Sequence, residues 1–157
     1  MYGKEILIET ADTGPGFKKD SAREAWNKTA FETADRFDRE GLKQLQESSP
    51  ERARVSHRNA EGLAMAARGM LAQQNSSVIE ALPNIKVPTL VLVGADDKPF
   101  LAATDYMVSK IKGSKKAVIP DAGHASNIDQ PELFNAALLD FFQGLEGRGG
   151  QNQKSKL

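Results

Sequence analysis

The sequence predicts an α/β domain with a short parallel sheet of about three strands, flanking helices and one long helical insertion. Short apolar, β-branched runs alternate with stretches of helical periodicity, which is typical of a parallel sheet with right-handed crossovers. A helical stretch, residues 18–83, separates the first two expected strands and is far longer than a crossover needs. An acidic residue and a histidine follow two neighbouring strands, at the edge where open α/β sheets build their sites.

The first expected strand is residues 5–10, E-I-L-I-E-T, which ends at a run of glycine and proline. The helical stretch after it, called here the helical block, begins with apolar residues at helical spacing from Ala22 to Phe37. The expected first positions or caps of its later helices are Pro50, Asn59 and Ser76 or Ser77. We expect the helical block to be a lid over the strand ends, and an ordinary packed helical subdomain is the alternative.

The second half of the chain alternates strictly. Residues 85–93, I-K-V-P-T-L-V-L-V, predict a strand buried on both faces. The elements expected after it are a helix over residues 100–111, a strand over residues 116–119 and a helix from residue 130 to Phe142 or Leu145. Residues 147–157, G-R-G-G-Q-N-Q-K-S-K-L, have almost nothing apolar to bury, so we expect a disordered tail after a folded part of residues 1–146.

Composition narrows the function classes. Lys+Arg and Asp+Glu are both 21, so the charge favours neither nucleic acid nor a membrane surface as a partner. The absence of cysteine excludes disulfides, thiolate metal sites and a cysteine nucleophile. No recognisable metal-ligand spacing is present, and no signal peptide or membrane-length apolar run is visible. We therefore expect a cytoplasmic protein without a metal.

Two polar positions stand directly after strands. Asp96 and Asp97 follow Gly94 at the end of one strand, and His124 follows Gly123 one helix and one strand later. Because the carboxyl ends of parallel strands meet at one edge of the sheet, we expect an aspartate and the histidine to lie together. An acid and a histidine in contact are half of a hydrolytic triad. A turn or cap role for the aspartates and a plain loop role for the histidine are the alternatives.

The segments V-P-T-L-V-L-V-G-A-D-D-K-P and I-P-D-A-G-H-A-S-N-I-D-Q-P-E-L-F-N resemble the C-terminal half of the α/β-hydrolase fold family. The nearest type carries a helical lid, as in carboxylesterases, lactone hydrolases and ring-cleavage-product hydrolases. The resemblance implies that residues 1–146 form part of such a domain, with the lid at about residues 18–83. It implies no cofactor, since the family's mechanism needs side chains and water alone.

The resemblance also implies roles for single residues. Asp97, three residues after the strand-ending glycine, corresponds to the triad acid, with Asp96 as the fallback. His124 corresponds to the general base. The remaining candidates are expected to be a turn residue (Asp121), a surface or lid residue (His57) and core residues that could instead line a substrate cavity (Trp26, Met65 and Met70).

The family's nucleophile is not in this sequence. No serine has glycine both two residues before and two residues after it, as the strained G-x-S-x-G turn requires. The sequence therefore predicts a hydrolase of a small ester, lactone or related acyl compound that supplies acid and base, with the nucleophile, serine or aspartate, coming from elsewhere. Because a sheet cut from a larger one would expose an edge at residues 6–10, we also expect a partner that covers it, either the missing N-terminal half or a second copy of this chain. A non-catalytic dimerising or ligand-binding fragment and a truncated inactive gene product are the alternatives.

Overall fold

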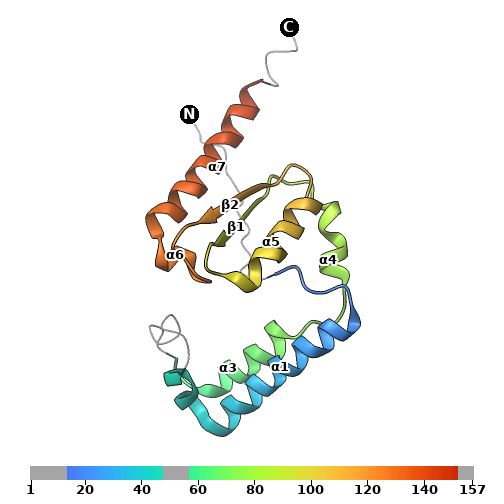
Figure 1. Cartoon of the computed structure of the whole chain (residues 1–157), viewed down its shortest axis with the longest axis vertical. Coiled ribbons are helices and arrows are strands. Elements are labelled where there is room, and N and C mark those ends of the chain that lie inside the picture. The colour runs from blue at the N-terminus through green and yellow to red at the C-terminus, as the bar shows by residue number, and fades with distance from the viewer. Residues whose placement is uncertain (1–13, 48–56, 152–157) are drawn as a thin grey trace.

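The computed structural model describes residues 14–47 and 57–151, which form a small sheet with its helices and a separate layer of helices (Figure 1). The sheet contains β1 (Leu90–Gly94) and β2 (Lys115–Ile119), which run parallel. Leu90 lies opposite Lys115, and Gly94 lies opposite Ile119, so the two strands end level with each other. The loops after the two strands are therefore brought to the same edge of the sheet.

Helices cover both faces of this sheet. Lys115 forms an ion pair with Asp140 on α7 (Pro131–Gln151), with 3.4 Å between nitrogen and oxygen. The next residue, Lys116, pairs with Asp105 on α5 (Lys98–Lys110). Because successive side chains of a strand point to opposite faces, α5 and α7 lie on opposite sides. This is the layering expected from the strand–helix alternation.

The strands differ from expectation in number, length and burial. The described residues contain two strands, and the expected third, residues 5–10, lies outside them. The strand expected over residues 85–93 begins five residues later, at Leu90. Before it the chain turns instead, with Thr89 Oγ1 donating to the carbonyl of Val87, which is largely exposed. Val91 and Val93 are buried on one face, but Leu90 and Leu92 on the other are only half-buried, so burial on both faces was wrong.

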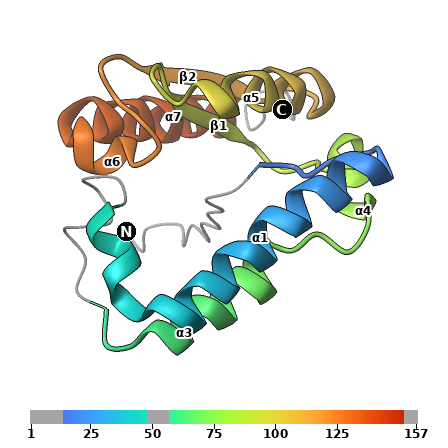
Figure 2. The ribbon, with the colours of Figure 1, turned by 60° about the horizontal axis from the view of Figure 1, so that its bottom comes forward.

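The described residues of the helical block form helices joined by short loops and contain no strand, as expected. Its two longer helices, α1 (Asp20–Glu40) and α3 (Ala60–Ala66), lie side by side as an antiparallel pair (Figure 2). Asn59 caps α3, as predicted, by accepting a hydrogen bond from the backbone of Gly62 at 3.0 Å. The remaining elements are the 3₁₀ turns η1 (Gly41–Glu47) and η3 (Leu82–Asn84), the π-helix η2 (Ala67–Leu71) and α4 (Ser77–Ala81). The helix expected behind Pro50 falls on residues 48–56, outside the described part of the chain, except for its last residue, His57, which is half-buried and not helical.

Small residues form the contact between α1 and α3. Ala34, Ala64 and Ala67 are buried together with Phe37, and alanine lets two helices approach closely. The methionines expected to pack here do not. Met65 and Met70 are 66% and 82% exposed, so their assignment to the core was wrong.

Polar contacts fasten α1 to the far end of the block. The side-chain amide of Asn27 both donates to the carbonyl of Gln73, at 2.8 Å, and accepts from its N–H, at 2.7 Å. Trp26 Nε1 donates to the carbonyl of Leu71 at 2.6 Å. Arg68 donates to Asp35 and Asp38 on α1, and the hydrogen bonds from Asp38 and then Asp35 raise the pKa of its guanidinium. Residues 68–73 of the block are thus tied to α1 by side chains from Trp26 to Asp38.

The last helix is longer than expected. α7 continues to Gln151 instead of ending at Phe142 or Leu145, so it enters the segment expected to be a tail, whose residues 152–157 lie outside the described chain. Its glycines give no sequence reason for this extension. In the part of the chain that the structure describes, no helix has both the length and the apolar character needed to cross a membrane.

Candidate active site

The candidate site is made by two loops, one after each strand. Residues 94–97 form the acid loop and residues 120–124 form the histidine loop. The backbone N–H of Asp96, in the acid loop, donates to the carbonyl of Ala122 at 2.9 Å, and that of Ala95 donates to Ile119 at 2.8 Å. The loops therefore continue the pairing of the strands beyond the sheet.

Gly94 makes this approach possible. A Cβ added to Gly94 would lie 2.2 Å from the carbonyl oxygen of Gly123 and 2.3 Å from that of Ala122. Both are backbone atoms, which cannot rotate away as a flexible side chain can. The glycine is thus required for the two loops to pack against each other, and it does more than end the strand.

Asp97 and His124 are in direct contact, as the sequence predicted. His124 Nδ1 lies 2.8 Å from Asp97 Oδ2. The carboxylate accepts, so Nδ1 carries the proton and Nε2 presents the lone pair. The Asp97 side chain is 10% exposed, whereas that of His124 is 48% exposed. A buried acid thus holds an imidazole that a ligand can reach.

The two other aspartates of these loops take different roles. Asp96 is exposed. It contacts the histidine loop through its backbone N–H and not through its carboxylate. Asp121 has a φ of 50°, a left-handed conformation that aspartate tolerates in turns. Asp121 is therefore a turn residue, as expected, and Asp97 instead of its neighbour faces the histidine.

A fourth carboxylate, not singled out from the sequence, holds the histidine loop in place. Asp129, at the end of α6 (Ser126–Asp129), accepts a hydrogen bond from the backbone N–H of Gly123 at 2.8 Å. The carbonyl of Asp121 in the same loop accepts from Gln130 Nε2 at 3.2 Å. These contacts fix the backbone of the histidine loop just before His124, and so help to position its side chain.

Replacing Asp129 by alanine is expected to lower the free energy of unfolding by about 1–3 kcal/mol, because the Gly123 N–H loses a charged acceptor. Asp129→Asn should recover much of this loss, since its amide oxygen can still accept. Urea denaturation followed by circular dichroism measures both. Equal midpoints for Asp129→Ala and the unchanged protein would show that the contact does not hold the loop.

Phe100 also contacts the histidine and was not anticipated as a site residue. Its ring centroid lies 4.9 Å from that of His124, with 39° between the ring planes. Its backbone N–H donates to the carbonyl of Asp97 at 2.9 Å. The available signal was its place three residues after the acid, in the first turn of the helix.

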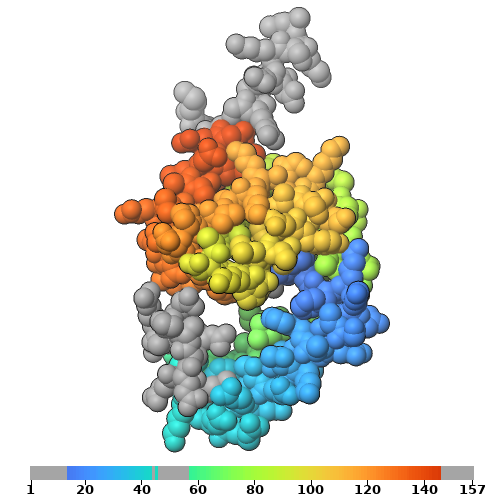
Figure 3. All heavy atoms as spheres, viewed as in Figure 1, coloured from blue at the N-terminus to red at the C-terminus, as the bar shows by residue number. Residues whose placement is uncertain are grey.

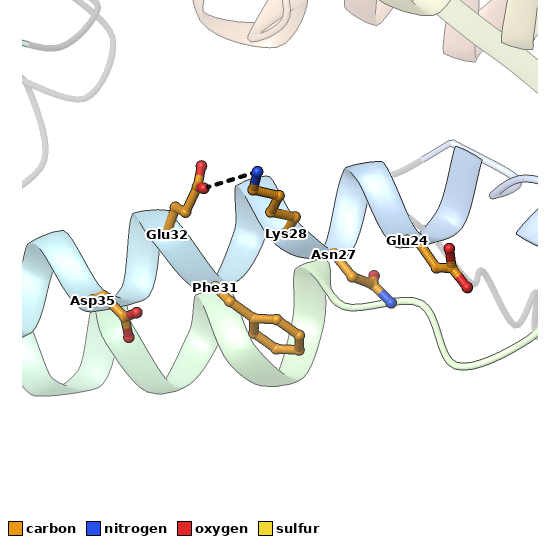
Figure 4. Close-up of a pocket in the computed structure, with 6 residues that line it drawn as sticks. All are labelled: Glu24, Asn27, Lys28, Phe31, Glu32 and Asp35. Atoms are coloured by element: carbon orange, nitrogen blue, oxygen red, sulfur yellow. Dashed lines mark ion pairs between the residues drawn. The ribbon is translucent and has the colours of Figure 1, made fainter. Parts of the chain in front are cut away.

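The surface between the sheet part and the helical block is hollowed in the space-filling view (Figure 3). In the view of Figure 1 the loops after the strands lie at the end of the sheet that faces the block. A separate shallow depression of about 470 Å³ lies along α1, away from Asp97 and His124. Figure 4 shows its lining residues, which are Glu24, Asn27, Lys28, Phe31, Glu32 and Asp35. Because all six come from one helix and most are charged, it resembles a solvated helix surface more than a substrate site.

The described residues include histidines, aspartates and glutamates, which are possible metal ligands. No group of three or more histidine, aspartate or glutamate side chains there is arranged to hold an ion. The arrangement at the strand ends is that of an acid and a base for moving a proton, the role of the corresponding pair in acyl transfer.

Comparison with known proteins finds that the chain is similar to part of several hydrolases. The chain is 36% identical over 89 residues to 3-oxoadipate enol-lactonase 1 of Acinetobacter baylyi, covering 55% of this chain and 32% of that enzyme. The structure superposes on a thermophilic esterase of Thermogutta terrifontis with a TM-score of 0.64 and 29% identity, covering 85% of this chain and 54% of the esterase. It matches the fold of MenH from S. aureus with a TM-score of 0.72 and 24% identity, over 85% and 57% of the two chains.

No family model matches the chain. It spans about a third of the length of the enol-lactonase and about half of the two solved structures. Over that shared part the chain has the fold of part of an α/β-hydrolase.

Proposed function

We propose that this chain supplies the acid and the base of a hydrolase that acts on a small ester, lactone or related acyl compound. The observation that carries the proposal is the 2.8 Å contact between buried Asp97 and half-exposed His124 at the ends of two parallel strands. The names of the relatives support the substrate class, since one is an enol-lactonase and one an esterase.

In the proposed reaction, His124 Nε2 takes the proton of a hydroxyl nucleophile as its oxygen attacks the acyl carbon. Asp97 stabilises the resulting imidazolium and keeps Nδ1 as the donor. The proton on Nε2 then passes to the leaving oxygen as the carbon–oxygen bond breaks. Water repeats the sequence on the acyl intermediate and restores the nucleophile.

We propose that the nucleophile of this reaction lies outside the given sequence, which contains no G-x-S-x-G turn. Two features support a partner at the sheet. Within the described residues β1 pairs with one neighbour, β2. Large apolar side chains on β2 and α7 are exposed, namely Val118, Leu133 and Leu139. We propose that the N-terminal half of an α/β-hydrolase, or a second copy of this chain, covers this surface.

A chimera tests the proposed function. In the chimera, this chain replaces the portion of the Thermogutta terrifontis esterase that superposes on it. The rest of the esterase, which this chain does not match, is kept unchanged. Turnover of p-nitrophenyl acetate by the chimera, above that of the same chimera with His124→Ala, is expected. A folded chimera with turnover equal to its His124→Ala variant would contradict the proposal.

The oligomeric state of the chain, taken together with the turnover of the chimera, distinguishes the alternatives. Light scattering that shows a stable dimer, with no ester turnover by either the dimer or the chimera, would favour a non-catalytic assembly module. A monomer that binds the complementary part of the esterase would favour the first partner over a second copy.

A further inference from the structure

We propose that Phe100 is a positioning residue for His124, and that it couples the imidazole to the segment entering the helical block. This inference rests on the proposed role of His124 as a base. Neither the relatives nor the residue pattern assigns a role to Phe100, whose role is inferred from its contacts.

One turn of chain holds the imidazole in two ways. The carboxylate of Asp97 accepts from Nδ1 at 2.8 Å, and the ring of Phe100 packs on the imidazole at 4.9 Å between centroids. The backbone hydrogen bond from Phe100 to the carbonyl of Asp97, 2.9 Å long, fixes the spacing of these two side chains. The acid and the aromatic ring are thus positioned together at the start of α5.

The second contact supplies what the first cannot. A hydrogen bond at Nδ1 sets the distance to the carboxylate but leaves the ring able to swing about that bond. The side chain of His124 is 48% exposed, and the ring of Phe100 lies against the imidazole. Contact between two tilted rings favours one orientation by roughly two- to tenfold, so Phe100 keeps Nδ1 on Asp97.

The ring of Phe100 also meets the chain that leads into the helical block. A Cβ added to Gly14 would lie 3.4 Å from Phe100 Cε1, so the backbone there passes against the edge of the ring. Three residues later the N–H of Phe17 donates to Gln73 Oε1 at 3.1 Å, and the backbone of Gln73 is held by Asn27 on α1. A displacement of the helical block therefore changes what packs on Phe100.

The test measures which nitrogen of His124 carries the proton. The chain has two histidines, so long-range ¹H–¹⁵N correlation spectra in mildly alkaline buffer resolve His124 with His57 as an internal reference. The unchanged chain should hold His124 with its proton on Nδ1. Phe100→Leu is expected to lower the ratio of Nδ1–H to Nε2–H forms at His124 by roughly two- to tenfold, and Phe100→Tyr should restore it.

Matched variants separate positioning from general loss of structure. Phe31→Leu removes an exposed ring from α1 and should leave both histidines unchanged. Gly14→Val, whose methyl groups reach the Phe100 ring, should shift His124 in the same direction as Phe100→Leu, whereas Gly14→Ala, at ordinary contact distance, should not. These two keep the inference testable where Phe100→Leu does not fold.

An unchanged His124 ratio in folded Phe100→Leu, or in folded Gly14→Val, would overturn the corresponding half of the inference. Asp97→Asn is the separate test of the acid–base pair in the same spectra. If Asp97→Asn leaves His124 unchanged, the proposed function fails whatever Phe100 does. If Asp97→Asn shifts it and Phe100→Leu does not, the proposed function stands and this inference fails.

Discussion

Asp97→Asn in the esterase chimera is expected to lower kcat for p-nitrophenyl acetate by roughly 10⁴-fold. An asparagine keeps the size of the side chain but has no charge, and its amide can donate to Nδ1. Donation to Nδ1 would put the imidazole proton on Nε2, where the lone pair is needed to take the proton of the nucleophile. The loss would therefore fall on the chemical step, with little change in KM.

Asp96→Asn is the matched control for this result. It makes the same chemical change one residue earlier, at an exposed side chain whose contact with the histidine loop runs through the backbone. Its kcat should stay within about threefold of the unchanged chimera, as for an ordinary surface substitution. Equal losses at Asp96 and Asp97, or a larger loss at Asp96, would show that the wrong carboxylate has been assigned.

The strand ends were predictable because their signals are local. A β-branched run ending in glycine marks the end of a strand, and a polar residue directly after it lies at the carboxyl edge of a parallel sheet. Asp97 and His124 were found in this way, and their contact is confirmed by the 2.8 Å distance. The choice of Asp97 over Asp96 came from the family resemblance, and the structure supplies its physical reason, which is that one is buried and the other exposed.

The residues that the sequence did not assign depend on tertiary contacts. Phe100 was expected only as the first residue of a helix, and Asp129 was given no role. Nothing near either in sequence reveals its contact with a residue 24 or 6 positions away. Identifying such residues requires the three-dimensional structure.

The methionines failed for a different reason. Met65 and Met70 were placed by the usual helical period, but residues Ala67–Leu71 form a π-helix. A π-turn holds more residues than an α-turn, so the side chain of Met70, inside it, is rotated away from the expected face. Met65 lies before the π-helix, in α3, and the π-turn does not explain its exposure. In addition, close packing of α1 against α3 selects small residues, and alanines occupy the contact. A pattern that weighs apolar residues by size favours the larger side chain, which was wrong here.

Gly94→Ala is expected to be the most damaging single substitution for the fold, costing at least about 3 kcal/mol of the free energy of unfolding. The added Cβ would lie 2.2 Å from one backbone oxygen of the histidine loop and 2.3 Å from another. Relief requires the histidine loop to move away as a unit, which stretches the 2.9 Å hydrogen bond from Asp96 to Ala122. The same movement would separate His124 from Asp97, so stability and the acid–base pair should be lost together.

Gly69→Ala provides the control, because a Cβ there meets nothing within 4 Å. It should unfold at the same urea concentration as the unchanged chain or at a higher one, since alanine favours helix over glycine. Both variants add one methyl group, but only the one at Gly94 meets the backbone of the histidine loop. A lower urea midpoint for Gly94→Ala than for Gly69→Ala therefore reports the close approach of the two loops. A folded Gly94→Ala that keeps the urea midpoint and the Nδ1 proton of His124 would mean that the loops are not held against each other. The 2.8 Å contact on which the proposed chemistry depends would then lack its structural cause.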